Sequence, residues 1–429
     1  MRIIDLRNLK PDAAAEFLDK PLLQDNTRVE EIVRNIIADV RAHGDAAVFT
    51  YIRRFDWPDA DSLVVPDKDI DRAYSQVSDK LLAAIRMAKA NIEDFHKKQL
   101  RSSWTEEMRP GRILGQIVRP LERVAVLAPG FQAPLPSSVL MGAVPAKVAG
   151  VHEVFLCTPP RNDGSIHPAI AVAAREAGVD RIFRIGGAHG VAAMAWGTES
   201  VPRVDKIVGP GNVYVATAKR FVFGQVGIDM LAGPSEVLVL ADESANPAYI
   251  AADLLSQAEH DRDARSILIT TSAAVAEKVA AEAELQLGRL SRESTARESL
   301  ESNGAIVLVG SMADGISLVN RVAPEHLELA VEDPVSILDS IKNAGAIFMG
   351  GYAAEPIGDY VAGPNHTLPT SGTARFASPL NVDDFVKKSS LIMYTREALL
   401  EEASAAIELA EAEGLDAHAN ALKIRVDGA

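Results

Sequence analysis

Residues able to bind a metal ion or move a proton occur in several separate stretches of the sequence. Gln257 and His260 stand three residues apart in "SQAEHD", after the apolar run "YIAADLL", which predicts a helix. That spacing puts both side chains on one helical face. Asp359 and His366 lie in the segment 358–379, "GDYVAGPNHTLPTSGTARFASP", which is dense in Gly, Pro, Ser and Thr. A long loop of this kind inside a compact enzyme is usually functional.

A second contribution comes from the C-terminal stretch "EGLDAHANAL", which carries Glu413 and His418. Together, Gln257, His260, Asp359 and His418 would offer two imidazoles, a carboxylate and an amide oxygen, without a thiolate. This donor set suits zinc or manganese. Solvated helix, loop and tail residues are the alternative, and because the four are scattered over the chain, spacing alone leaves both open.

Glu325 and His326 are neighbours in "NRVAPEHLELAV", just after a proline. A carboxylate and an imidazole are the two commonest general bases. Neighbours in a loop can point to different sides of one cavity, so this pair is a candidate acid–base unit. The alternative is a solvated turn.

Glycines cluster in "RIGGAHG" and "KIVGPGN", each of which follows a strand-like run and precedes a helical one. Such turns let backbone amides approach a phosphate at a helix start, at the carboxyl ends of the strands. Neither stretch is a G-x-G-x-x-G. A dinucleotide site and plain strand–helix turns therefore remain equal alternatives on pattern alone.

The elements that must position these residues indicate an α/β protein. Residues 25–115 have apolar residues at spacings of three and four, which predicts helices. From residue 123, short apolar runs alternate with helical segments, which predicts βαβ units and parallel sheets. Eight such runs are expected to be strands: "RVAVLAPG", "EVFLCTPP", "RIFRIGG", "KIVGPGN", "EVLVLAD", "RSILITTS", "AIVLVGS" and "AIFMGG". A break between two sheets is expected near 230–237, and the chain beyond about 380 reads as helical again.

Bulk properties exclude several classes of protein. The net charge of −15 argues against nucleic acid as the main partner, because phosphate binding needs clustered Lys and Arg. No apolar run reaches the length of about 18 residues that a membrane span needs, and the first residues lack the features of a signal peptide. The single cysteine, Cys157, lies in a strand-like run and is expected to be a buried structural thiol. A cytoplasmic protein is the simplest interpretation.

Six stretches resemble the histidinol dehydrogenase family in order and spacing: "DKIVGPGNVYVATAKR", "DMLAGPSEVLVLAD", "DLLSQAEHD", "RVAPEHLEL", "GDYVAGPNHTLPTSGTARF" and "EGLDAHANAL". The resemblance covers essentially the whole chain. It implies oxidation of L-histidinol to L-histidine through L-histidinal, in histidine biosynthesis, with NAD⁺ and one zinc ion per subunit. It also implies an intertwined homodimer with two incomplete Rossmann-like domains and small helical appendages.

The resemblance further implies a division of the chain into four parts. These are an N-terminal arm (1–22), a first Rossmann-like domain carrying the zinc and catalytic residues (23–125 with 238–380), a second, NAD-side domain (126–237), and a C-terminal helical tail (381–429).

Carried over residue by residue, the resemblance assigns roles to the candidate residues. Glu325 and His326 match the acid–base pair, with His326 taking the hydroxyl proton and Glu325 activating water for attack on the aldehyde. The zinc ligands would be Gln257, His260, Asp359 and His418, with His418 coming from the partner subunit. The substrate contacts would be Ser235, His366 and Glu413 together with the zinc ligands and the acid–base pair, and the cofactor contacts would be Leu127, His189 and Asn212.

Three residues depart from the family's pattern on the cofactor side. Where the family usually reads "YVPGG-x-A", this chain reads "LAPGFQA", with Leu127 at the aromatic and Phe131 at the second Gly; His189 replaces a Gln. NAD binding is then rearranged or weakened, or the chain is a paralogue with a changed preference. We hypothesise rearrangement, with Phe131 or His189 stacking in place of the lost aromatic.

Two other functions are weighed against histidinol oxidation. A paralogue acting on another polar alcohol, such as a sulfonated diol, would not need the contacts of His366 and Glu413, which are present. A catalytically inactive binding protein would not need the four ligand matches and the Glu–His pair. The presence of these residues therefore favours histidinol oxidation over both alternatives.

Overall fold

The protein is described here by a computed structural model that covers residues 1–7, 18, 26–130 and 134–428. The chain divides into two compact units, each described by itself. The main unit comprises Met1–Gln99 with Glu122–Phe385, and the tail unit comprises Leu100–Leu121 with Val386–Ala429. Most of the expected N-terminal arm, 1–22, and Phe131 lie outside the described residues.

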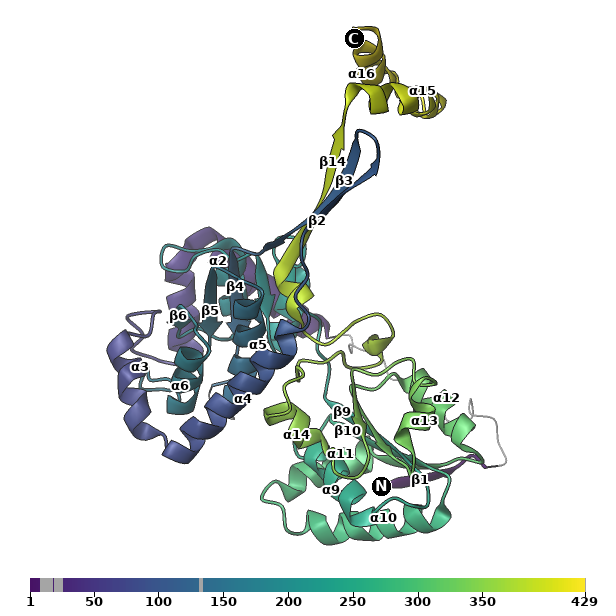
Figure 1. The fold of residues 1–429 in the computed structure, drawn as a ribbon. Helices are drawn as coiled ribbons and strands as arrows, with labels where there is room; N and C mark the ends of the chain where they lie inside the picture. The colour runs from purple at the N-terminus through teal and green to yellow at the C-terminus, as the bar shows by residue number, and fades with distance from the viewer. Residues whose placement is uncertain (8–17, 19–25, 131–133, 429) are drawn as a thin grey trace. The chain divides into compact units, whose positions relative to one another are not determined.

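The main unit contains a six-stranded parallel sheet (Figure 1). Its strands, in order across the sheet, are β1 (Arg2–Asp5), β11 (Ala305–Leu308), β10 (Arg265–Thr270), β9 (Glu236–Ala241), β12 (His326–Ala330) and β13 (Ala346–Met349). The associated helices are α9 (Pro247–Ala258), α10 (Ala273–Leu287), α11 (Glu293–Ser302), α12 (Met312–Val322), α13 (Pro334–Leu338) and α14 (Glu355–Tyr360).

Both faces of this sheet are buried, which explains its continuous apolar strands. In β9, Leu238 and Leu240 pack in a core with α12, whereas Val237 and Val239 pack in another core with α9 and α10. Alternate residues of a strand point to opposite faces, so one apolar run serves both cores.

A second, five-stranded parallel sheet lies in the same unit. Its strands, in order, are β6 (Arg181–Phe183), β5 (Glu153–Cys157), β4 (Arg123–Leu127), β7 (Lys206–Val208) and β8 (Gly227–Ile228). The helices between them are α5 (Pro136–Val148), α6 (Pro168–Glu176), α7 (Gly187–Trp196) and α8 (Val213–Val222). The strand order reverses between β4 and β7, which makes the carboxyl ends of these two strands the topological switch point.

All eight runs expected to be strands form strands, four in each sheet, and the chain passes from one sheet to the other between β8 and β9, at the expected break. The expected α/β class with parallel sheets is therefore confirmed. Cys157 is buried at the end of β5, and burial raises the pKa of its thiol.

The N-terminal helices pack beside the five-stranded sheet, whereas the expected division groups 23–125 with the zinc-side domain. They are α2 (Thr27–Phe55), α3 (Asp67–Ala73) and α4 (Asp79–Lys97). The 3₁₀ turn η2 (Tyr74–Gln76) lies between α3 and α4. The buried stripe of α2, which includes Val33 and Val48, packs in one core with Phe155 and Ala192. The grouping follows from this apolar contact with α7 and α8 rather than from order along the chain.

The tail unit is built on an antiparallel sheet of β2 (Trp104–Arg109), β3 (Arg112–Pro120) and β14 (Val386–Tyr394), followed by α15 (Arg396–Ala412) and α16 (Asp416–Asp427). Its strands correct two expectations, because 100–115 and the start of the last segment had a helical reading. The β2–β3 hairpin turns at Pro110–Gly111, where Gly111 has a φ of +75°. Two further 3₁₀ turns, η3 (Thr373–Arg375) and η4 (Val382–Phe385), belong to the main unit and come before β14 in the sequence.

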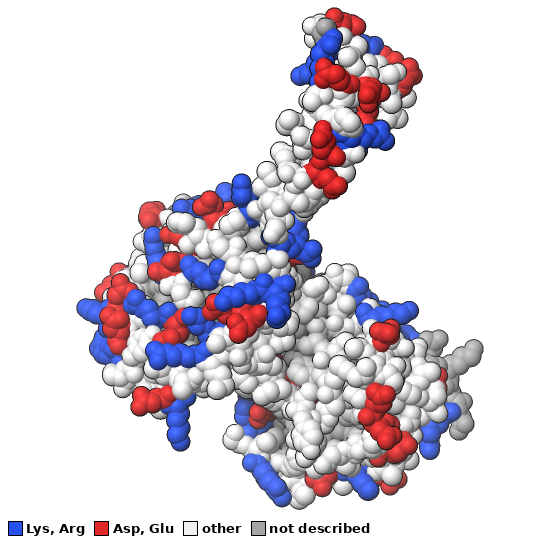
Figure 2. Space-filling model, viewed as in Figure 1, with Lys and Arg blue, Asp and Glu red and all other residues white. Residues whose placement is uncertain are grey.

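Acidic and basic side chains alternate over the face of the molecule shown in Figure 2, without a continuous basic surface in that view. None of the helices in the described part of the chain is long and apolar enough to span a bilayer.

Candidate active site

Glu325 and His326 are held on the main chain of Glu236, at the amino edge of the six-stranded sheet. The Glu236 N–H donates to Glu325 Oε2 at 2.8 Å, and the Glu236 carbonyl lies 3.0 Å from His326 Nδ1. His326 opens β12 and is paired in register with Val237. Both side chains are buried. The pair therefore sits at a strand start, which corrects the expectation of a loop.

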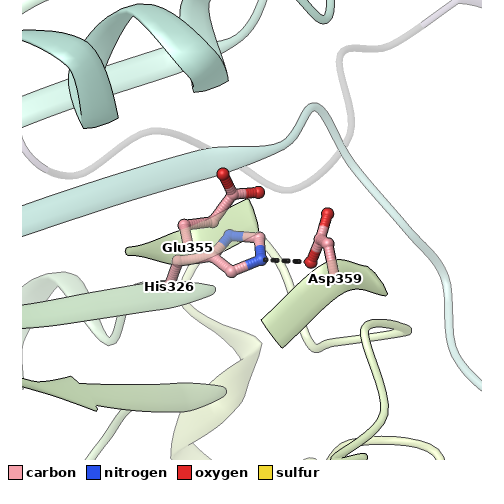
Figure 3. A group of neighbouring side chains, drawn as sticks. All are labelled: His326, Glu355 and Asp359. Carbon is pink, nitrogen blue, oxygen red and sulfur yellow. Dashed lines mark ion pairs between the residues drawn. The ribbon is translucent and has the colours of Figure 1, made fainter. Parts of the chain in front are cut away.

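The contact with Glu236 fixes the tautomer of His326. A carbonyl only accepts hydrogen bonds, so Nδ1 carries the proton that bonds to it. In the neutral ring, Nε2 is then the basic nitrogen. Figure 3 shows Nε2 directed at Asp359, and the distance to Asp359 Oδ1 is 3.6 Å. In that neutral form, the geometry presents the unprotonated ring nitrogen to the centre of the cluster.

Three side chains here are close enough to bind one metal ion. Ligand atoms of His326, Glu355 and Asp359 all lie within 4.8 Å of one another (Figure 3). Glu355 and Asp359 are four residues apart on α14 and so share a helical face. Glu355, a buried residue whose Oε2 accepts from Ser256 Oγ at 3.0 Å, was not among the expected site residues, although its spacing from Asp359 is the signal that would have identified it.

Gln257 and His260 reach the same edge from α9. The helix ends at Ala258, and His260 lies in the following turn, where its N–H donates to the Gln257 carbonyl at 3.2 Å. The expected single helical face is therefore replaced by a helix end and a turn. Both His260 and His366 interact electrostatically with Asp359, which places the three in one neighbourhood.

The amide of Gln257 has no partner in the described part of the protein. The residue is 1% exposed, and neither Oε1 nor Nε2 makes a hydrogen bond there. Nε2 of His366 likewise makes no hydrogen bond there, and Nε2 of His326 has only the ion-pair contact with Asp359. Buried polar atoms are normally satisfied, so this group of open donors and acceptors points to a ligand.

The loop that carries His366 is anchored at several points within the main unit. Asn365 Nδ2 donates to the Met141 carbonyl at 2.7 Å, and the Ser371 N–H donates to Glu236 Oε1 at 3.0 Å. Asp359 belongs to α14 rather than to the loop, so the segment without regular structure is shorter than expected. These bonds limit the movement of His366.

Burial and mutual charge shift the pKa values at this edge. Burial raises the pKa of Glu325 to about 8, although His326 opposes the shift. Burial lowers the pKa of His326, but the carboxylates of Glu325 and Asp359 outweigh it and raise the pKa to about 10. A cation beside Asp359 would lower both values, because it disfavours the protonated forms.

Three more carboxyl groups, those of Glu355, Glu328 and Asp253, lie close to one another. Burial raises the pKa of Glu355 to about 7 and that of Glu328, beside Asp253, to about 9. The Glu355 N–H donates to Glu328 Oε1 at 3.1 Å. This bond links α14 to β12.

Of three further expected site residues, Ser235 belongs to the main unit, and Glu413 and His418 belong to the tail unit. Ser235 immediately precedes β9 and is partly buried; its carbonyl accepts from the Arg265 N–H at 3.0 Å. Glu413 caps the end of α15 and His418 lies on α16, both exposed in the tail unit. Their roles stay predictions.

Two of the expected cofactor residues, Leu127 and Asn212, lie at the switch point of the five-stranded sheet. Leu127 ends β4 with its side chain in the core, and a Cβ on Gly209 would lie 2.3 Å from the Leu127 carbonyl oxygen. Asn212 caps α8, since its Oδ1 accepts from the N–H groups of Tyr214 and Val215 at 3.1 and 3.2 Å. The glycine turn thus brings β7 and the start of α8 close to β4.

His189 is buried within α7 rather than presented to solvent. Its ring stacks on Tyr51 at a centroid distance of 5.8 Å, and Nε2 lies 3.9 Å from Asp56 Oδ2. Burial lowers the pKa of His189 to about 4 and raises that of Asp56 to about 6. Stacking of His189 on a dinucleotide would therefore require this side chain to leave its packed position.

Comparisons with known proteins agree with the motifs. The sequence profile of the histidinol dehydrogenase family matches residues 21–426. A histidinol dehydrogenase of Geobacter metallireducens is 53% identical over 431 aligned residues, covering 100% of this chain and 99% of that protein. One from Listeria innocua is 55% identical over 395 residues, covering 92% of each.

A solved structure shows the same fold. The crystal structure of histidinol dehydrogenase from Elizabethkingia anophelis is 38% identical, covers 100% of this chain and 98% of that chain, and superposes with a TM-score of 0.95. None of these similarities supports a paralogue that acts on a different alcohol. The sequence motifs, the fold and the relatives agree that the chain belongs to the histidinol dehydrogenase family.

Proposed function

We propose that this chain is a zinc-dependent, NAD-linked dehydrogenase that oxidises L-histidinol to L-histidine through L-histidinal, at the end of histidine biosynthesis. The observation that carries the proposal is the Glu325–His326 pair. Both side chains are bound to the Glu236 main chain, and the free Nε2 of His326 faces Asp359.

His326 is suited to accept the hydroxyl proton in the alcohol step. With its Nδ1–H donated to the Glu236 carbonyl, Nε2 is the only ring nitrogen that can take a proton from substrate. Positioned general bases of this kind contribute about 10²–10⁴-fold to a rate. Bound NAD⁺ supplies the hydride acceptor in both oxidation steps.

Glu325 is suited to the aldehyde step. Its Oε2 is occupied by the Glu236 N–H, so its other oxygen remains to take a proton from a water molecule that attacks the aldehyde carbon. Its position beside His326, with 3.7 Å between Oε2 and Nδ1, lets the two groups divide the proton transfers of the two steps.

The residues present fit a zinc site. Gln257, His260 and Asp359 offer an amide oxygen, an imidazole and a carboxylate, and His418 of the partner subunit would complete the set. The unpartnered Gln257 amide is the independent support, since a bound ion would satisfy its oxygen. Zinc, when bound, would orient the substrate as a template. His366, Ser235 and Glu413 would contact the substrate.

The switch point of the five-stranded sheet fits the dinucleotide, with Leu127, His189 and Asn212 as the proposed contacts. A cytoplasmic homodimer is the proposed assembly, since the site needs a residue from the tail unit of a second chain. Exposed apolar residues on that unit, including Trp104, Met108 and Ile392, support a covered surface.

The test is a reaction with purified protein, L-histidinol and NAD⁺, with L-histidine measured by chromatography and bound metal by elemental analysis. Formation of histidine by zinc-loaded protein, and its loss after chelation, would support the proposal. Protein that carries zinc, binds NAD⁺ and forms no histidine would contradict it.

A further inference from the structure

A buried ion pair holds the peptide groups around Gly209 from two sides. The Gly209 N–H donates to Asp229 Oδ2 at 2.7 Å, and Lys219 Nζ donates to the Gly209 carbonyl at 3.0 Å. Lys219 and Asp229 also pair directly with each other, and their side chains are 4% and 1% exposed. One ion pair therefore fixes both polar groups of a single residue.

Gly209 occupies a demanding position. Its φ of +108° is one that residues with a side chain rarely adopt, and a Cβ there would collide with the Leu127 carbonyl. The residue joins β7 to the turn that ends at Asn212, the cap of α8. A small rotation at Gly209 would displace the start of α8 relative to the end of β4.

Stability alone does not explain charges at this place. Removing two charges from water is expensive, and a buried ion pair is often no more stabilising than two apolar side chains of similar size. What apolar side chains cannot do is bond the N–H and the carbonyl of Gly209. The specific effect of the pair is therefore on the shape of the turn.

We propose that Lys219 and Asp229 are positioning residues for the dinucleotide, which hold the Gly209–Asn212 turn in the conformation that binds it. The inference rests on the proposed function, which puts NAD⁺ at this switch point. Neither side chain touches the cofactor in this account. Both are buried, and the charge of Lys219 is already neutralised by Asp229.

The test replaces the pair by neutral side chains in the full-length, zinc-loaded protein. K219M/D229L removes both bonds to Gly209, whereas K219M/D229N keeps an acceptor for the Gly209 N–H. A matched control is K206M/D384L, because Lys206 starts the same strand, β7, and its Nζ pairs with Asp384 Oδ1 at 2.8 Å, at the end of the strand away from the turn.

We expect K219M/D229L to weaken NAD⁺ binding, measured by calorimetric titration, by about tenfold, in line with the loss of two net hydrogen bonds. K219M/D229N should lie between that variant and the wild type, and K206M/D384L should match the wild type. The turnover number at saturating NAD⁺, the KM for L-histidinol and the zinc content should stay unchanged in all three. If the pair only stabilised the fold, its loss would not weaken NAD⁺ binding while leaving the KM for L-histidinol unchanged.

Unchanged NAD⁺ affinity in K219M/D229L would overturn the inference, as would equal losses for NAD⁺ and L-histidinol. If K219M/D229L and K219M/D229N both fail to fold, the K219R variant tests the inference. It keeps the charge but changes the position of the donors, and unchanged NAD⁺ affinity in that variant would also overturn the inference. Wild-type protein that binds no NAD⁺ would instead contradict the proposed function.

Discussion

Replacing Gln257 by Leu should make the metal-free protein more stable, not less. The residue is 1% exposed, and among the described residues its Oε1 and Nε2 have no partner. Each unsatisfied buried polar group costs about 1–3 kcal/mol, and Leu has a similar size without that cost. We therefore expect metal-free Q257L to gain about 2 kcal/mol in the free energy of unfolding.

The gain translates into a measurable shift in melting temperature. An unfolding entropy of about 2.1 cal/mol/K per residue sums to about 0.9 kcal/mol/K for a chain of 429 residues, so 2 kcal/mol corresponds to about 2 °C. Smaller cooperative units would give larger shifts. With zinc this difference should shrink, because zinc at 100 times its Kd stabilises the wild type by about 2.7 kcal/mol. Q257L should gain less than this from the same zinc.

The assay is thermal unfolding of both proteins with a chelator and with zinc. Q286L is a matched control, because Gln286 Nε2 donates to the Ala248 carbonyl at 3.0 Å and the substitution removes a made bond. Q286L should be less stable than the wild type in both conditions and should bind zinc normally. Metal-free Q257L that is less stable than the wild type, or that keeps the wild-type response to zinc, would refute the reasoning.

The remaining predictions concern the acid–base pair and His189. Glu325→Gln keeps the acceptor for the Glu236 N–H and should slow oxidation of L-histidinal by about 10²–10⁴-fold, with the alcohol step little changed. Single-turnover formation of NADH from each substrate measures the two steps. Equal slowing of both steps would contradict the prediction. His326→Gln should slow the alcohol step more than the aldehyde step, and a normal alcohol step would exclude Nε2 as its base. Burial lowers the pKa of His189 to about 4. The unfolded chain therefore binds the extra proton first as pH falls below about 6.5, and the wild type loses stability there. H189Q should lack this loss, so its unfolding free energy relative to the wild type should rise by about 2 kcal/mol from pH 7 to pH 5, whereas a pH-independent difference would show that His189 titrates normally.

The parallel sheets could be predicted because strands buried on both faces read as short apolar runs. β12 was missed as a strand because its sequence, "HLELA", contains His326 and Glu328, and both are buried polar residues. β2 was missed for the opposite reason, since all its residues are exposed and no inward-facing apolar set marks it. Its Pro110–Gly111 turn was the one local signal available.

The chemistry of the site could be read from residue types, but not its geometry. Nothing in the sequence shows that the main chain of Glu236 holds both Glu325 and His326, because β9 and β12 become neighbours only in the folded sheet. The same holds for His189, which follows a pair of glycines in the sequence yet lies in α7 and packs on Tyr51. Tertiary packing decides these positions, and local pattern does not.

The yield of NADH per L-histidinol tests the central claim most directly. With L-histidinol limiting and NAD⁺ in excess, the absorbance of NADH at completion gives the ratio. Two NADH per L-histidinol are predicted, because the Glu325–His326 pair serves both the alcohol and the aldehyde step at one site. A ratio of one, with L-histidinal as the final product, would contradict the account and show an alcohol dehydrogenase that lacks the second oxidation.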